Sequence, residues 1–337
     1  MNNSNTLQNI EGVDTSAPST TSSSKSYELK LQHPVICVVG PTASGKTALA
    51  QVLAEQLNGE VVSADSMQIY TGMDIGTGKI YPEDRTVPYH GLDICKPGEA
   101  YSAALFQSDA RKAFADIEAR KKRSVLCGGT GLYVRAAIDA YNFPRGEQVE
   151  NPVREYYTKY AEEQGNDALW NLLNQKDEKS AALIHPNNVR RVVRAFELLE
   201  EGKTYAEVHE GLSDIKQAVS AVFFGLAVTP DVLNARIDTR VDGMVEEGLI
   251  EEVKSLLNQG FRAGITAPQA IGYKEIVAAL DGEITMEEAV EQIKIASHRY
   301  AKRQRTWFRK DKRIHWLDAD CPDVDNLLDQ IDRNLLY

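Results

Sequence analysis

The segment at residues 40–47, Gly-Pro-Thr-Ala-Ser-Gly-Lys-Thr, most constrains how this chain can fold. It fits the pattern G-x-x-x-x-G-K-[ST], in which the backbone N–H groups of a glycine-rich loop surround a diphosphate. The pattern needs a strand before it and a helix after it. Residues 34–39 are apolar and strand-like, and a helical stretch follows to about residue 57. We therefore expect a diphosphate site between a buried strand and a helix N-terminus.

The residue types of this loop suggest individual roles. Lys46 would add a positive charge beside the phosphates, and the hydroxyl of Thr47 would be a ligand of Mg²⁺. The motif leaves open whether the diphosphate belongs to a fuel, to a phosphoryl donor or to something else. ATP hydrolysis is disfavoured, because the apolar strand at 124–129 ends in glycines instead of an acid. The predicted diphosphate-binding residues are Gly40, Pro41, Thr42, Ala43, Ser44, Gly45, Lys46 and Thr47.

Strand-like and helical stretches alternate in the first part of the chain. Strands are expected at 34–39, 60–64 and 124–129, and Ser102 would cap a helix that runs to about residue 120. This alternation predicts an α/β fold of the P-loop NTPase type, a parallel sheet flanked by helices. Ligands of such sheets bind beyond the carboxyl ends of the strands. Three loops should therefore meet at one crevice: 40–47, 65–68 and 128–133.

The pattern changes in the middle of the chain. Apolar residues between 141 and 218 recur at helical spacing, which predicts an all-helical insertion. A strand is expected again at 221–228, followed by two long helices at 230–258 and 286–309 and a short strand near the end. The predicted parts are a disordered Ser/Thr/Asn-rich tail (1–33), the first part of the core (34–140), the insertion (141–218) and the second part of the core (219–337).

Composition excludes several classes of protein. No apolar run approaches the roughly 18 residues that span a bilayer, and the N-terminal segment lacks the basic and apolar regions of a secretory signal. The four cysteines form no CxxC pair, so neither a zinc site nor a disulfide framework is indicated. We expect a cytoplasmic monomer without membrane contact.

Charge is distributed unevenly along the chain. The net charge of −11 argues against nucleic acid, but eight basic residues and one acid lie between Arg299 and Arg313. Such a local patch matters more for phosphate binding than the total. The alternative is a solvated helix face. Arg190 and Arg194 form a second basic face within the insertion. The apolar stripe of the last long helix, which we expect in the core, comprises Val290, Ile293, Tyr300, Trp307 and Phe308.

Three single residues are candidates for chemistry. Asp65 ends the second strand, where a carboxylate could be a general base or metal ligand, or could cap the following turn. Thr130 follows two glycines and could donate to a phosphate oxygen or belong to a plain turn. Arg240 shares an inward helix stripe with Leu233, which is unfavourable unless an anion pairs with it. That anion could be the diphosphate or a structural carboxylate.

Taken together, these segments resemble the bacterial tRNA dimethylallyltransferases, also called tRNA isopentenyltransferases. The resemblance covers residues 34–318 and rests on "GPTASGKTALA", "SADSMQIYTGMDIGTGK", "GGTGLY", "HPNNVRRVVRAFE", "QAIGYKE" and "AKRQRTWFR", in that order. It implies transfer of the dimethylallyl group of dimethylallyl diphosphate to N6 of adenosine 37 beside the tRNA anticodon, with Mg²⁺. The diphosphate would then be the leaving group, and the target base would be flipped out of its loop.

The resemblance also implies roles for individual residues. Asp65 would take the proton from N6, while Lys46, Thr130 and Arg240 would stabilise the departing diphosphate. The implied tRNA contacts are Asp65, Ser66, Met67, Gln68, Thr130, Arg154, Arg190, Arg191, Arg194, Gly272, Tyr273, Lys274, Lys302, Arg303 and Gln304.

Other functions remain as alternatives. An adenylate isopentenyltransferase would act on free AMP, ADP or ATP, but such relatives read Gly-Gly-Ser-Asn-Ser where residues 128–132 read Gly-Gly-Thr-Gly-Leu. A P-loop small-molecule kinase would lack the "AKRQRTWFR" segment. An RNA-binding P-loop switch would bind a nucleoside triphosphate without transferring a prenyl group.

Overall fold

A parallel sheet of six strands forms the centre of the molecule. The computed structural model describes residues 29–336 apart from 142, 144–150, 212–215 and 322, so most of the expected disordered tail lies outside the described residues. Neighbouring strands pair in the order β3-β2-β4-β1-β5-β6, and every pairing is parallel. The expected α/β fold is confirmed. The strands are β1 (Val35–Val39), β2 (Gly59–Ser63), β3 (Tyr89–His90), β4 (Arg123–Gly128), β5 (Ala221–Ala227) and β6 (Ile314–Asp318).

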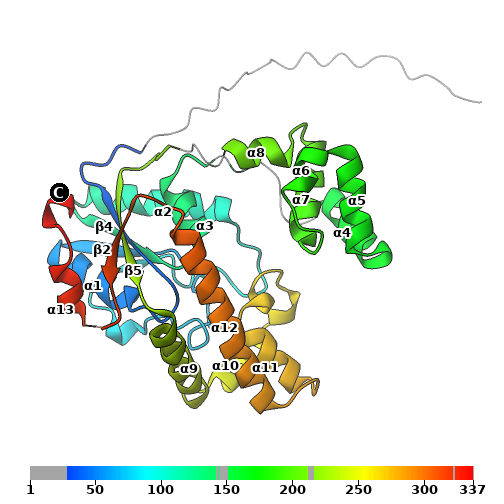
Figure 1. Ribbon diagram of the computed structural model, residues 1–337. Coiled ribbons are helices and arrows are strands. Elements are labelled where there is room, and N and C mark those ends of the chain that lie inside the picture. Colours follow the sequence, from blue (N-terminus) through cyan, green and yellow to red (C-terminus); the bar gives the residue numbers. More distant parts are fainter. Residues whose placement is uncertain (1–28, 142, 144–150, 212–215, 322, 337) are drawn as a thin grey trace, which may run out of the picture.

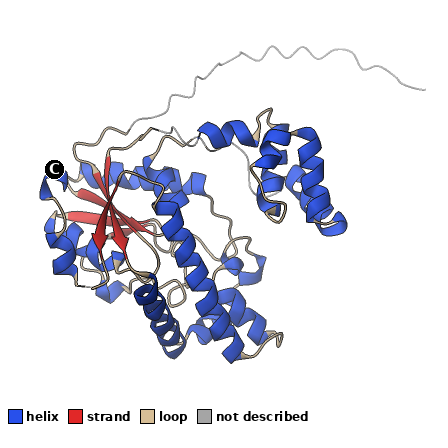
Figure 2. Ribbon diagram, viewed as in Figure 1, coloured by secondary structure: helices blue, strands red, loops and turns tan. Residues whose placement is uncertain are grey.

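Helices cover both faces of the sheet (Figures 1 and 2). One face packs against α2 (Ala103–Ala119) and α3 (Gly131–Ile138). All residues of β1, β2 and β4 are buried, as expected for parallel strands that are covered on both sides. The other face packs against α1 (Lys46–Gln56), α9 (Pro230–Glu246), α10 (Leu249–Leu257), α11 (Tyr273–Leu280), α12 (Met286–Phe308) and α13 (Val324–Asp329).

The second part of the core departs from the sequence prediction at one helix. The single helix expected at 230–258 is wrong, because Gly248 adopts a left-handed conformation (φ 106°) and separates α9 from α10. The last long helix is confirmed as α12, and it begins with a capping box in which Thr285 and Glu288 exchange hydrogen bonds. The short turns of 3₁₀ helix are η1 (Pro82–Asp84), η2 (Phe261–Ala263), η3 (Ala267–Gln269) and η4 (Arg333–Leu336).

The described residues between 151 and 211 form five helices with a hydrophobic core of their own. Leu169, Leu173, Val192 and Phe196 are buried at its centre. Asp139 and Gln217 form an antiparallel bridge, so the segments entering and leaving this region run side by side. Figure 1 shows the region set to one side of the sheet. The helices are α4 (Pro152–Gln164), α5 (Asn166–Lys176), α6 (Glu178–Ala182), α7 (Val189–Glu200) and α8 (Tyr205–Gly211).

Within the described part of the chain, no helix combines the length and apolar character needed to cross a membrane.

Candidate active site

The glycine-rich loop joins β1 to α1 in an anion-binding conformation. Gly45, with φ of 90°, precedes α1, so the free N–H groups of the first helical turn border the loop. Lys46 Nζ donates to the carbonyl of Pro41 at 2.9 Å. Burial lowers the pKa of Lys46, and the nearby negative charge of Asp65 opposes that shift. Ser44 Oγ is buried and has no hydrogen-bond partner among the described residues, which leaves it to a ligand oxygen.

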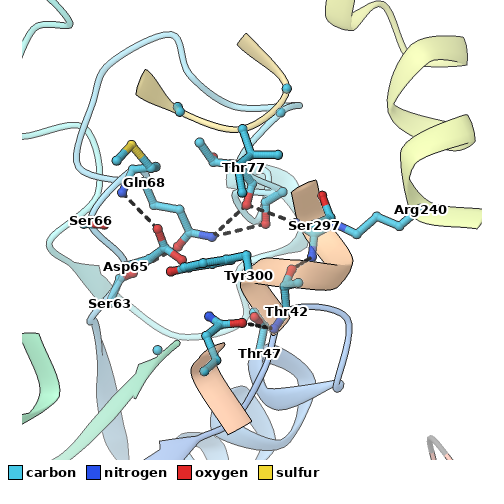
Figure 3. Close-up of a pocket in the computed structure, with 18 of the residues that line it drawn as sticks. Thr42, Thr47, Ser63, Asp65, Ser66, Gln68, Thr77, Arg240, Ser297 and Tyr300 are labelled. Atoms are coloured by element: carbon cyan, nitrogen blue, oxygen red, sulfur yellow. Dashed lines mark hydrogen bonds between the residues drawn. The ribbon is translucent and has the colours of Figure 1, made fainter. Parts of the chain in front are cut away.

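A cavity of about 310 Å³ opens beside this loop, at the carboxyl ends of the central strands. The loops at 40–47 and 65–68 line it, with α9 and α12 on the other side. The third expected loop contributes Gly128, while Thr130 lies just behind the wall, where its Oγ1 accepts from Ser66 N at 3.1 Å. Lys46 contributes a positive charge to the cavity. Its other polar groups include Thr47, Asp65, Gln68, Arg240 and Tyr300 (Figure 3).

Asp65 fills one of the roles that its position suggested, the cap of the following turn. Its Oδ1 accepts from Met67 N at 2.9 Å and so caps the following turn, but the residue also lines the cavity. Among the described residues, no hydrogen bond engages Oδ2. Tyr300 extends from α12 towards Asp65 (Figure 3). Burial, with a further contribution from the charge of Asp65, raises the pKa of Tyr300 to about 12, so this hydroxyl stays protonated.

Arg240 reaches the cavity from α9 and has no carboxylate at ion-pair distance within the described part of the chain. Its Nη1 donates to Thr42 Oγ1 at 2.9 Å and its Nη2 to the Thr77 carbonyl at 3.1 Å. A Cβ at Gly78 would lie 2.0 Å from Nη2, so this glycine allows the close approach. Burial lowers the pKa of Arg240, partly offset by Asp65. Of the two partners suggested by the sequence, the structural carboxylate is ruled out among these residues.

A loop over the cavity is held by a carboxylate that sequence analysis missed. Glu252 accepts hydrogen bonds from the backbone N–H groups of Asp74, Ile75 and Gly76, at 3.0, 2.8 and 3.2 Å. Tyr273 donates its hydroxyl to Glu252 at 2.6 Å. No local pattern could have signalled this contact, because Glu252 and the loop are far apart in sequence.

The expected tRNA contacts at residues 272–274 need correction. Tyr273 is fully buried and its hydroxyl is engaged by Glu252, so its side chain is not displayed for tRNA in this structure. Burial, with the charge of Glu252, raises its pKa. Gly272 lines the cavity, whereas Lys274 is exposed, with its Nζ 3.5 Å from Oε1 of Glu275.

Gln304 also differs from its expected role as a tRNA contact. It is 5% exposed, and its Oε1 accepts from Thr42 N at 2.9 Å. Its Nε2 donates to the Gly129 carbonyl at 3.0 Å, and a Cβ at Gly129 would lie 2.3 Å from that nitrogen. Both amide atoms are thus used within the protein, where they join the glycine-rich loop to the loop after β4.

The opposite side of α12 displays its cations. Arg299, Lys302 and Arg303 are exposed, and no ion pair engages them among the described residues. Arg303 lies over the ring of Tyr300, 5.5 Å from its centroid. Trp307, which we expected in the core, is 41% exposed on this side. The core prediction is therefore wrong for Trp307, and it is right for Ile293 and Phe308, which are buried.

The basic residues of the insertion fall into two groups. Arg190 and Arg191 are exposed on α7. Arg154 and Arg194, by contrast, each place a guanidinium nitrogen 2.7 Å from the buried carboxylate of Glu197. Burial alone would raise the pKa of Glu197, but the hydrogen bonds from Arg154 and Arg194 outweigh that effect and lower it. The expected basic face is therefore partly neutralised.

Comparison with known proteins places this geometry in a family. The family model described as IPP transferase matches residues 68–311, and the model described as isopentenyl transferase matches residues 33–86. The tRNA dimethylallyltransferase of Carboxydothermus hydrogenoformans is 44% identical over 304 residues, which cover 89% of this chain and 97% of that protein. The one of Bacillus subtilis is 45% identical and covers 86% and 92%.

Solved structures with a similar fold and sequence belong to enzymes of the same kind. The full-length tRNA isopentenylpyrophosphate transferase of Bacillus halodurans matches with a TM-score of 0.63 and 44% identity, over 86% of this chain and 90% of that one. A eukaryotic dimethylallyltransferase acting on tRNA matches with a TM-score of 0.72 and 29% identity, over 88% and 77%.

Proposed function

The chain belongs to the tRNA dimethylallyltransferase family, and we propose that it transfers the dimethylallyl group of dimethylallyl diphosphate to N6 of adenosine 37 beside a tRNA anticodon. The observation that carries this proposal is the shared cavity, in which the glycine-rich loop faces Asp65 and Arg240, a cation that none of the described carboxylates pairs with. Because the cavity is built from one chain, we propose that the enzyme acts as a monomer. We place it in the cytoplasm, where such an enzyme would meet tRNA.

Departure of the diphosphate is the step that the loop supports. As the C1–O bond of the allylic donor breaks, positive charge grows on the allyl group and negative charge on the diphosphate. Lys46 and Arg240 line the cavity, and with the N–H groups of the loop they would stabilise that anion. Fixed donors in a water-poor site stabilise developing charge effectively. Apolar side chains line the same cavity and suit a five-carbon hydrocarbon group; they are Ile237, Val241, Met244 and Ile293.

Formation of the new bond requires the loss of one proton. The amine nitrogen N6 attacks C1, and the N–H proton is transferred to Asp65, whose Oδ2 is not used by the described residues. The carboxylate is held by its bond to Met67 N, which fixes its direction. Enclosing both reactants supplies orientation, which a freely diffusing pair lacks.

Mg²⁺ fits the residues of this site as a partner of the donor's phosphates. The described residues contain no cluster of three or more His, Cys, Asp or Glu side chains that could hold a metal. Mg²⁺ in phosphate sites commonly uses one or two protein oxygens together with phosphate oxygens and water. Thr47 lines the cavity and is the residue that we expect to hold the ion. When bound, the ion would neutralise charge on the diphosphate.

Binding of tRNA would use the exposed cations beside the cavity. Arg303 lines both the cavity and the basic face of α12, so a base that enters the cavity carries its backbone past this face. A free nucleotide carries phosphate at one end only, whereas an RNA backbone could contact several of these cations at once. This arrangement favours tRNA over AMP as the acceptor.

The test is an acceptor competition with labelled donor. Purified protein is incubated with radiolabelled dimethylallyl diphosphate and either tRNA, AMP or ATP, and products are separated by chromatography. We expect label in tRNA as N6-isopentenyladenosine, with little in the free nucleotides. Label in AMP at a comparable rate would favour an adenylate isopentenyltransferase, and rapid ATP hydrolysis without label transfer would overturn the leaving-group interpretation.

A further inference from the structure

We propose that Trp307 is a stacking platform for the base of a nucleotide next to the flipped adenosine. The inference deepens the proposed function and rests on it, because it names how the RNA around the target base is held. Trp307 is 41% exposed near the end of α12, although Phe308 beside it is buried. Single exposed apolar residues are common in proteins, but Trp307 is distinguished by the cations that line the same hollow.

The indole ring is held in place rather than loosely displayed. A Cβ at Gly131 would lie 2.1 Å from both Cδ1 and Nε1 of Trp307, so the start of α3 packs closely against this edge of the ring. Any side chain at position 131 would displace the ring. A fixed aromatic ring loses little conformational entropy when a base stacks on it.

Cations surround the exposed ring. A hollow of about 420 Å³ is lined by Trp307 and Thr306 together with basic side chains. No ion pair engages these basic groups among the described residues. An aromatic face within a basic groove is the arrangement that proteins use for unpaired nucleotides, with charge along the backbone and stacking for the base. The basic residues of the hollow are Arg299, Lys302, Arg303 and Lys310.

The hollow adjoins the cavity of the target base. Arg303 lines both spaces. Gly131, against which the edge of the indole packs, directly follows Thr130, and Thr130 accepts a hydrogen bond from the backbone of Ser66, which lines the cavity. Turning one base out of a loop removes a stacking partner from its neighbours. Trp307 lies where a neighbour could regain one.

The chain provides a matched control. Trp316 on β6 has the same exposed fraction, 41%, but lines neither the cavity nor the hollow. Replacement of Trp316 by Leu therefore reproduces the loss of an exposed indole without touching the proposed platform.

The experiment is a cycle of protein and RNA changes. Anticodon stem-loop RNA is prepared intact and with an abasic site on the 5′ or the 3′ side of the target adenosine, and Kd is measured for the wild type, Trp307→Leu, Trp307→Phe and Trp316→Leu. We expect one abasic site to weaken wild-type binding by about 5- to 150-fold, the range for one base–aromatic stack. Trp307→Leu should weaken binding of intact RNA by a similar factor, and the Kd of this variant should no longer change when that base is removed. Trp307→Phe should retain most of the affinity, and Trp316→Leu all of it.

Two results would overturn the platform. One is wild-type binding that neither abasic site weakens, a measurement that needs no variant to fold. The other is a loss in Trp307→Leu that simply adds to the abasic loss, as expected for a structural defect. Failure of the proposed function is a separate outcome, since wild-type protein would then transfer no label to intact tRNA.

Discussion

The cations of α12 and those of the helical insertion look alike in sequence but have different surroundings in the structure. On α12, Arg299, Lys302 and Arg303 are exposed, and no described carboxylate pairs with them. In the insertion, Arg154 and Arg194 are held by Glu197, which is 3% exposed. The difference shows that spacing reveals which cations share a helix face, whereas the position of a carboxylate decides which of them can meet a phosphate.

The cavity borders α12 but not the insertion, and substitutions there should have a third kind of effect. There the groups converge on one small volume, so a single substitution should remove chemistry rather than binding. On the surface of α12, charges act additively, and each loss should be graded and sensitive to salt. The following changes are ordered by their expected effect on transfer.

Asp65→Asn should give the largest loss, about 10²–10⁴-fold in kcat, which is the usual contribution of a general acid or base. The amide keeps an acceptor for Met67 N, so the turn should persist and Kd for tRNA should change little. Steady-state kinetics and RNA titration check this. The control is Asp84→Asn, at an exposed site outside the cavity. A near-normal kcat in Asp65→Asn would show that Asp65 is not the base.

Gln304→Ala should reduce kcat/KM for dimethylallyl diphosphate by about 10- to 100-fold, because a small misplacement of a catalytic loop is costly. The change removes the bonds to Thr42 and Gly129 that join the two loops. Arg303→Ala, one residue away on the exposed side, should instead raise KM for tRNA. If Gln304→Ala affected tRNA affinity alone, its assignment as a link between loops would be wrong.

Replacing Arg299, Lys302 and Arg303 together by Gln should flatten the slope of log K against log salt for tRNA binding. If each cation neutralises one phosphate, the change approaches about 2–2.7, three times 0.7–0.9. Affinity for dimethylallyl diphosphate should remain, since that site is built from the inner loops. A salt titration measures the slope, and an unchanged slope would make this face merely solvated.

Glu197→Gln in the insertion should have the smallest effect on transfer at saturating tRNA but should lower thermal stability. The pKa of Glu197 is depressed in the folded protein, so its stabilising contribution is fully present above the ordinary glutamate pKa. It is lost as the pH falls from there through the lower pKa of the folded state. The difference in Tm between wild type and variant should therefore be larger at pH 7 than at low pH. Equal differences at both pH values would show that the ion pairs contribute nothing.

The elements that sequence predicted well are those whose signal is local. The buried strands β1 and β4 are continuous apolar runs, and both were placed to within one residue, because parallel strands covered on both faces need no alternation. The glycine-rich loop was predicted between a strand and a helix, and it joins β1 to α1. β3 was missed because two residues carry no periodicity.

The parts of the site that escaped prediction depend on distant partners. Gln304 lies 262 residues from Thr42, and Glu252 lies 178 residues from Asp74, yet each pair is joined by a hydrogen bond. Nothing in the neighbourhood of either residue indicates the partner. Trp307 was assigned to the core because its spacing matches the apolar stripe, but its place near the helix end leaves it at the rim.

The central claim is that the cavity performs the chemistry while α12 delivers the RNA, and single-turnover transfer at increasing tRNA concentration tests it directly. The account predicts that the Arg299/Lys302/Arg303→Gln protein needs more tRNA but reaches the wild-type rate at saturation. Asp65→Asn should saturate at ordinary tRNA concentration and remain slow at every concentration. The reverse pattern, a surface variant that stays slow at saturation or an Asp65→Asn protein rescued by excess tRNA, would contradict this division of roles.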